Sequence, residues 1–189
     1  MARAAPLGSV RVPGSFVLSR RALILSCGTQ MLVGQEAWAE PLHAALPSPR
    51  DQVIVTVTGA IGRTNAAGRA ELDLAMLEGL GLHELTTWTP WTNGETKFAG
   101  VLGRRLLSAL DAHGSEVVGT AMNDYKSIIP FDDFDSYDVL LATRMNGTPL
   151  RIRDKGPIWV IYPWSQNPEL DDEVTRRKSV WQLNHLDVR

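Results

Sequence analysis

The chain has 189 residues, of which 44% are hydrophobic and 21% are charged. These proportions are typical of a folded globular chain and exclude one that is largely disordered. The formal net charge of −2 gives no basic excess, which argues against a nucleic-acid partner.

The first forty residues differ in character from the rest. Arg20 and Arg21 precede an apolar run that is too short to span a bilayer, and the sequence AWA at 37–39 is a pattern that signal peptidase accepts. We therefore predict a signal peptide over residues 1–39 and a periplasmic protein, exported by the twin-arginine route or by ordinary secretion. Its removal leaves 15 Lys and Arg against 20 Asp and Glu, a net charge of −5.

A Pro-rich linker, residues 40–50, leads to one domain, residues 51–189, in which the hydrophobic period alternates between that of strands and that of helices. In chain order we predict a strand at 51–59, a helix at 71–81, a strand at 83–91 and a helix at 98–114. Strands follow at 116–125, 127–131, 138–147, which ends in a turn at Asn146 and Gly147, and 157–163; then come a short polar helix at 167–179 and a closing strand at 181–188. This mixture predicts an α+β fold.

Several kinds of active site are excluded by residue type. The only cysteine, Cys27, lies in the predicted signal peptide, so the mature chain has no thiolate to serve as nucleophile or metal ligand. The four histidines lack the spacing of a zinc site. The acidic stretch 132–138 lacks the glycine and terminal glutamate of a calcium-binding EF-hand, and we interpret it as a solvated turn. No nucleophile-elbow or phosphate-loop motif is present.

Four segments of the domain, in order, carry a resemblance to a known family. DVLLATRMNGTPLRIRDKGPIWVIYP (138–163) has the MNG, the following PL and the later GP of the sulfite-oxidase-fold molybdopterin-binding domain. GTAMNDYKSIIPF (119–131) resembles the preceding hairpin of that domain, KFAGVLGRRLLSAL (97–110) its W-x-G-V helix, and SVWQLNHLDV (179–188) its last strand. The resemblance implies the sulfite-oxidase fold, with mixed sheets and short helices.

One departure from the family pattern concerns the metal. The resemblance implies a molybdenum-binding cysteine at or near Trp88, and the sequence has none there. A molybdenum centre needs a soft thiolate from the protein, which Trp, Thr and Pro cannot supply. We therefore expect the pterin half of the site without the metal half.

The chain is similar in this respect to small exported members of the family that bind a plain pterin. This similarity implies a reduced pterin, such as a tetrahydropterin, as ligand, and the periplasmic domain of a membrane-bound cyclic-di-GMP signalling enzyme as partner. We expect a monomer that does not turn its ligand over. Two alternatives stay open: a molybdopterin-dependent oxidoreductase acting on a small oxyanion or sulfoxide, and a scaffold with an empty pocket.

Candidate site residues follow from what a pterin needs: a face to stack on, and polar groups for its ring edge. Trp88 and Trp91 are candidates for stacking, or else are core residues. Asn123, Asp124 and Tyr125 form a polar tip that is either a binding edge or only a hairpin turn.

Further candidates come from the second half of the chain. Arg144, an isolated cation in an apolar strand, is predicted to face the ligand or to pair with Asp124 or Asp138. Weaker candidates lie at three places. They are Arg153 and Lys155 in a loop, Tyr162 and Trp164 at a strand end, and Lys178 and Ser179 where the resemblance implies a phosphate-binding cation. The loop of Arg153 and Lys155 could equally be a solvated turn.

Overall fold

The computed structural model describes residues 46–189. The chain divides into two units, Met1–Trp38 and Ala39–Arg189, and the described residues lie in the second. The predicted signal peptide, its cleavage site and part of the linker lie outside the described residues. In the part of the chain described, no helix is long and apolar enough to cross a membrane.

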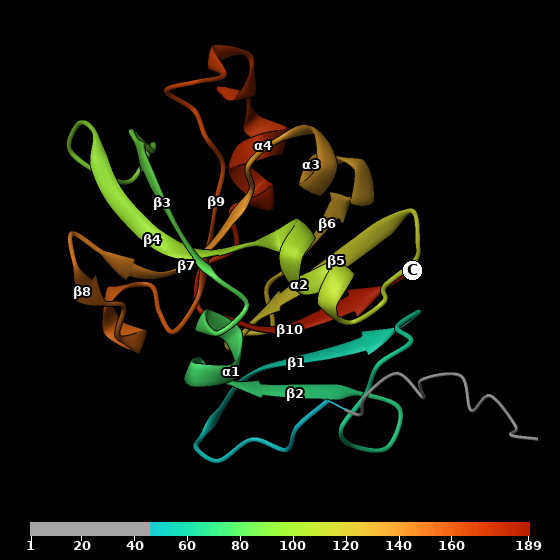
Figure 1. The fold of residues 1–189 in the computed structure, drawn as a ribbon. Coiled ribbons are helices and arrows are strands. Elements are labelled where there is room, and N and C mark those ends of the chain that lie inside the picture. The colour runs from blue at the N-terminus through green and yellow to red at the C-terminus, as the bar shows by residue number, and fades with distance from the viewer. Residues whose placement is uncertain (1–45) are drawn as a thin grey trace, which may run out of the picture. The chain divides into compact units, whose positions relative to one another are not determined.

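The first sheet has five strands in the order β2-β1-β10-β5-β6 (Figure 1). Their bounds are Val53–Gly59 for β1, Ala70–Asp73 for β2, Glu116–Ala121 for β5, Lys126–Pro130 for β6 and Leu183–Val188 for β10. β1 and β10 pair in parallel, and the other neighbours are antiparallel. Along β1 the buried Val55 and Val57 alternate with the half-buried Thr56 and Thr58, so one face of the sheet packs on the core.

The second sheet joins the strands of the middle of the chain. It consists of β3 (Leu82–Thr87), β4 (Thr96–Leu102), β7 (Leu140–Met145), β8 (Thr148–Pro149) and, paired with β7, β9 (Trp159–Ile161). All its pairs are antiparallel. On β4, a Cβ at Gly100 would lie 2.1 Å from the carbonyl oxygen of Leu141. Only glycine lets β4 and β7 approach this closely.

Short helices connect the strands. They are α1 (Leu74–Glu78), α2 (Gly103–Ala109), α3 (Phe131–Ser136) and α4 (Glu173–Lys178), with single 3₁₀ turns η1 (Ile152–Asp154) and η2 (Pro168–Leu170). The Asp172 carboxylate caps α4 by accepting from the backbone N–H groups of Val174 (2.7 Å) and Thr175 (3.0 Å). α3 and α4 lie side by side at the top of Figure 1, where an ion pair of Asp133 and Lys178 joins them.

Aromatic side chains form much of the core. The largest fully buried side chains include Trp159, Trp164, Tyr162, Phe98 and Phe134. Burying a side chain of this size contributes on the order of 2–3 kcal/mol each, so the aromatic residues are a main source of the domain's stability.

The predicted α+β fold is confirmed, but two predicted helices begin as strands. The segment 71–81 first forms β2, and only 74–78 is helical, because Ala70–Asp73 pairs with β1. The segment 98–114 first forms β4, which lies between β3 and β7. Its helix α2 ends with Leu110 as C-cap, rather than at Gly114.

Two local predictions have opposite outcomes. The acidic stretch 132–138 was expected to be a solvated turn, but Phe131–Ser136 forms α3, and its Phe134 is 2% exposed. Burial of this one ring anchors a segment that is otherwise polar. The predicted turn at Asn146 and Gly147 is confirmed: both residues have positive φ, 51° and 78°, as the tight turn between β7 and β8 requires.

Candidate functional site

A cavity of about 310 Å³ lies between α4, the β5–β6 hairpin and two tryptophans. Its lining residues are Trp91, Ala121, Asn123, Tyr125, Glu173, Arg176, Arg177, Ser179, Val180 and Trp181. The rings of Trp91 and Trp181 meet edge to face, with 5.4 Å between centroids. The cavity thus offers an aromatic wall and several polar groups, and its volume is at the lower end of small-molecule sites.

The tip of the β5–β6 hairpin forms one side of the cavity. Asp124 has φ of 65°, and its N–H donates to the carbonyl of Ala121 at 3.0 Å. The Asn123 Oδ1 accepts from the N–H of Tyr125 at 3.2 Å, and the Asn123 amide N–H₂ has no hydrogen-bond partner among residues 46–189. The Tyr125 hydroxyl donates to the Arg177 carbonyl at 2.9 Å. The hairpin and α4 are therefore tied together across the cavity.

The α4 side of the cavity carries charges that already have partners. Arg176 donates to Asp171 at 2.5 Å, and Arg177 pairs with Glu173. Ser179, which follows α4, is 2% exposed, and its hydroxyl lies 3.5 Å from the carbonyl of Thr175. These groups supply both donors and acceptors to a ligand edge.

The aromatic wall continues into a cluster of five tryptophans. Trp91 lies 6.0 Å from Trp159 and 6.2 Å from Trp164, and Trp88 lies 6.2 Å from Trp164, measured between ring centroids. Trp159 is fully buried, and its indole N–H has no hydrogen-bond partner among residues 46–189. Such an unpaired donor costs about 1–3 kcal/mol, which the packing of the ring must offset.

Lys155 lies against this cluster. Its Nζ is 4.2 Å from the ring centroid of Trp181 and 5.2 Å from that of Trp159, within cation–π range. Its backbone is left-handed, with φ of 74°, and its carbonyl accepts from the N–H of Gln182 at 3.0 Å. Burial lowers the pKa of the Lys155 ammonium. The predicted loop thus brings a partly desolvated cation to the rings that form the cavity wall.

A second, largely buried polar cluster consists of Asp133, Tyr162 and Lys178 and lies between α3 and α4. One carboxylate oxygen of Asp133 accepts from the Tyr162 hydroxyl and from Lys178 Nζ, both at 2.6 Å. Lys178 also lies 5.2 Å from the centroid of the Tyr162 ring. Burial, and then the bond to Asp133, raises the pKa of Tyr162 far above its usual value. This cluster fixes the end of α4 against α3.

The structure brings four of the predicted site residues together in the cavity lining: Trp91, Asn123, Tyr125 and Ser179. Asp124 forms the turn beside them, and Lys155 contacts Trp181. Tyr162 and Trp164 were expected near the rim, but both are fully buried, and the Trp164 indole N–H donates to the Leu170 carbonyl at 2.9 Å. Trp88 is outside the lining.

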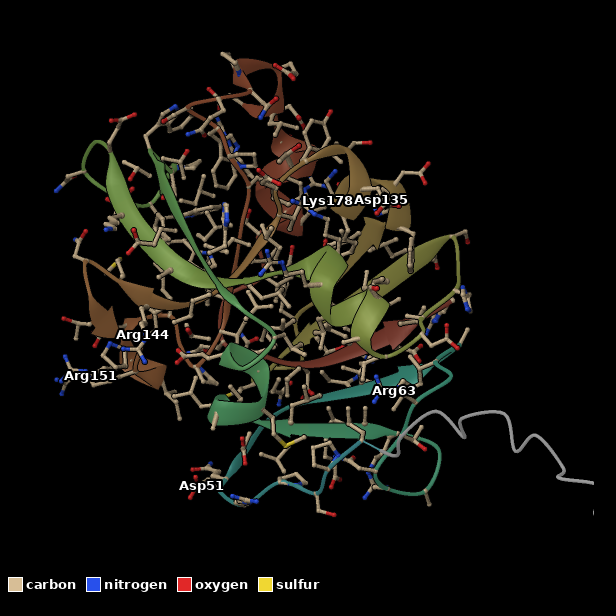
Figure 2. The ribbon with its side chains drawn as sticks, in the orientation of Figure 1. Asp51, Arg63, Asp135, Arg144, Arg151 and Lys178 are labelled. Atoms are coloured by element: carbon tan, nitrogen blue, oxygen red, sulfur yellow. The ribbon has the colours of Figure 1, made fainter. Side chains whose placement is uncertain are left out.

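Three predicted cations lie elsewhere. The Arg153 side chain is 71% exposed, and its Nε lies 3.7 Å from Oδ2 of Asp154. Lys178 is engaged by Asp133 and does not line the cavity. Figure 2 shows Lys178 and Arg144 in different parts of the molecule.

Arg144 forms an ion pair with Glu78. Its guanidinium makes two hydrogen bonds to that carboxylate, at 3.0 and 2.9 Å, and the Thr143 hydroxyl adds a third at 2.7 Å. The prediction that Asp124 or Asp138 would be its partner is therefore wrong; Asp138 pairs with Arg104. The bond from Arg144 holds the pKa of Glu78 below its usual range. A sequence reading could not foresee this pair, because it depends on how α1 packs beside β7.

Four charged or aromatic lining residues were not predicted from the sequence, namely Glu173, Arg176, Arg177 and Trp181, and neither were the apolar Ala121 and Val180. The first three lie in a polar segment that was correctly predicted as a helix, but a solvated helix face gives no sign of facing a cavity. Trp181 opens the predicted closing strand, and its proximity to Trp91 arises only in the tertiary structure.

No metal-binding cluster is apparent in residues 46–189, where no three His, Cys, Asp or Glu side chains converge. The resemblance implies a metal-binding cysteine at or near Trp88, but the polar side chains beside Trp88 carry hydroxyl groups. Thr87 accepts from the N–H of Ser165 at 2.9 Å, and Thr89 shares a 3.0 Å bond with Thr92. These hard, already bonded donors do not fit a molybdenum centre.

Comparison with known proteins gives one family and a fold relative. Residues 50–167 match the oxidoreductase molybdopterin binding domain. The sulfane dehydrogenase SoxCD from Paracoccus pantotrophus has a similar structure, with a TM-score of 0.55 and 15% identity, over 71% of this chain and 37% of that one. The chain thus spans little more than a third of that protein, and the likeness concerns the fold. No curated protein sequence matches the chain.

The ion pair of Arg144 and Glu78 yields a prediction that separates stability from binding. Arg144→Ala leaves the largely buried Glu78 carboxylate without its main partner, so we expect the free energy of unfolding at pH 7 to fall by about 1–2 kcal/mol. Glu78 has a lowered folded pKa, so the pair contributes fully above the unfolded value of 4.5 and its contribution is lost as the pH falls further. Urea unfolding of both proteins between pH 3 and 7 measures this, as the difference should shrink at low pH.

Ligand affinity provides the second measurement on the same variant. We expect Arg144→Ala to bind a reduced pterin as tightly as the unmodified protein, because Arg144 is not part of the cavity lining. A large loss of affinity with an unchanged unfolding curve would instead assign Arg144 to the ligand.

Proposed function

The chain belongs to the oxidoreductase molybdopterin binding domain family, and from this we propose that it is a pterin-binding protein that does not hold molybdenum. The observation that carries the proposal is the cavity whose aromatic wall is Trp91 and Trp181, in a chain with no cysteine after Cys27. The family supplies the ligand class, and the residues of this chain supply the pterin part of the site only.

The cavity lining suits the chemistry of a pterin. The ligand is a flat bicycle with apolar faces, so a tryptophan ring and the apolar side chains of Ala121 and Val180 can cover those faces. Its ring edge carries N–H donors and carbonyl and nitrogen acceptors. The Asn123 amide, the Glu173 carboxylate and the Arg176 guanidinium are the groups that would bind that edge. Bound pterin would supply a redox-active ring; the protein's residues would orient it and exclude water.

We further propose that the protein acts as a ligand-dependent regulator in the periplasm, where it controls a membrane-bound cyclic-di-GMP signalling enzyme. This rests on the resemblance to small exported members of the family and on the predicted signal peptide. A binding module of this kind signals only if the ligand favours one conformation or surface over another. The cavity lies between α4 and the β5–β6 hairpin, two elements whose outer faces are exposed, so occupancy can alter a surface that a partner reads.

A molybdopterin-dependent oxidoreductase is the second candidate, and the family match favours it. In that case the metal would lack a protein thiolate, or a partner subunit would complete the site. The two functions differ in metal content and in the role of the cavity tryptophan, which the following experiments measure.

The stacking role of Trp91 predicts a difference between two matched substitutions. Trp91→Leu removes an aromatic wall of the cavity, and we expect the dissociation constant for a tetrahydropterin, measured by calorimetry under anaerobic conditions, to rise about tenfold. Trp88→Leu is the control, because Trp88 belongs to the same cluster but is not in the lining. Equal affinities of the two variants, both folded by circular dichroism, would remove Trp91 from the binding site.

The absence of a thiolate predicts the metal content. Protein isolated from a periplasm that contains molybdopterin enzymes should carry no stoichiometric molybdenum, and its denaturation should release a pterin without metal, which becomes fluorescent once it has been oxidised. Elemental analysis and mass spectrometry of the released compound test both. About one molybdenum per chain would contradict this proposal and support the oxidoreductase.

Export predicts the start of the mature chain. Mass spectrometry of the protein from its native cells should find Glu40, within a few residues, at the N-terminus, and fractionation should place the protein in the periplasm. An intact N-terminus together with a cytoplasmic location would refute the export proposal.

A further inference from the structure

We propose that the cavity selects an uncharged pterin over a phosphorylated one, because each cation of its α4 wall is already neutralised by a carboxylate of this chain. The inference rests on the proposed function and specifies its ligand class. A phosphate ester carries about −1.5 to −2 charges at pH 7, so its binding requires cations that lack internal partners.

Lys178 is the first cation that is not available to bind the ligand. The resemblance places a phosphate-binding cation here, but in this structure Lys178 turns to Asp133, with Nζ 2.6 Å from Oδ2. Its side chain is 12% exposed and that of Asp133 is 13% exposed. The Tyr162 hydroxyl donates to the same oxygen, also at 2.6 Å. To reach a phosphate, Lys178 would have to leave a largely buried carboxylate behind, which is costly.

The two cations that do line the cavity are paired as well. Arg176 binds Asp171 at 2.5 Å, and Arg177 binds Glu173. The first pair is partly exposed and the second mostly exposed, but in both the carboxylate lies beside the guanidinium and offsets its local positive potential. Over residues 169–178 the count is three cations against four carboxylates, a net charge of −1. The wall is therefore not basic.

The other polar lining groups are neutral donors and acceptors. Asn123 and Tyr125 come from the hairpin and Ser179 from the end of α4. Lys155, which has no carboxylate partner among the described residues, is held over the Trp181 and Trp159 rings and is not in the lining. Such a set suits the ring edge of a pterin with a neutral side chain.

The experiment compares two ligands and three proteins. The ligands are a 6-hydroxymethyl dihydropterin and its phosphate monoester. The proteins are the unmodified chain, Asp171→Asn, which frees Arg176, and Asp138→Asn as matched control. The control removes an equally short, 2.5 Å ion pair, with Arg104, from outside the cavity. Dissociation constants are measured by calorimetry at low and at moderate salt, and the fold of each variant is checked by its unfolding midpoint.

We expect the unmodified protein to bind the neutral pterin at least about tenfold more tightly than the phosphate ester. Asp171→Asn should bind the ester about three- to tenfold more tightly than the unmodified protein does, with a gain that falls as salt rises. Its affinity for the neutral pterin should change by less than its affinity for the ester, and both affinities of Asp138→Asn should be unchanged.

Three other results would each contradict one part of the proposal. Equal or tighter binding of the ester by the unmodified protein would overturn the selectivity and leave pterin binding intact. A preference for the neutral pterin that Asp171→Asn does not reduce would overturn its electrostatic cause. Binding of neither ligand would refute the proposed function itself, and the selectivity with it.

Discussion

The packing of Trp159 joins the core to the candidate site, and much of the structure depends on it. Trp159 lies on β9, meets Phe98 of β4 edge to face at 5.6 Å, and packs against Trp91 at 6.0 Å. It also forms a backbone bridge to Trp181, just before β10. One buried residue thus connects the second sheet with the two tryptophans that wall the cavity. Because a close-packed core resists deformation, the cavity is held by rigid elements and not by loops alone.

This arrangement explains why the sequence predicted the architecture better than the site. The strands were found from period-two patterns such as that of β1, and the Asn146–Gly147 turn from the chemistry of positive φ. The hydrophobic period alone could not separate strand from helix where one apolar run forms first a strand and then a helix, as in β4 and α2. α3 escaped notice because a single buried residue, Phe134, holds an acidic segment in place. These misses arise where tertiary contact overrides local preference.

The predicted site residues show the same difference between what local patterns and what tertiary contacts determine. Asn123 and Tyr125, predicted from a polar hairpin tip, and Trp91, predicted from the resemblance, line the cavity. Tyr162 and Lys178 were placed near a ligand, whereas the structure turns both toward Asp133, whose role no pattern indicated. The fold at 15% identity to SoxCD does not by itself assign chemistry, since one fold supports many functions. What this chain can do follows from the partners its own cations and hydroxyls have found.

The parallel pairing of β1 with β10 has a consequence for how the domain is made. These strands are the first and the last of the described chain, yet they are neighbours within the first sheet, with Thr56 opposite His185. On the ribosome, β1 has no native neighbour on that side until nearly all of the domain has been synthesised. Long-range contacts of this kind make folding slow, and until they form, β1 and β5 present open edges prone to wrong pairing. The first sheet is therefore completed only after β10 has been made, and loss of this one strand would separate β2 and β1 from β5 and β6.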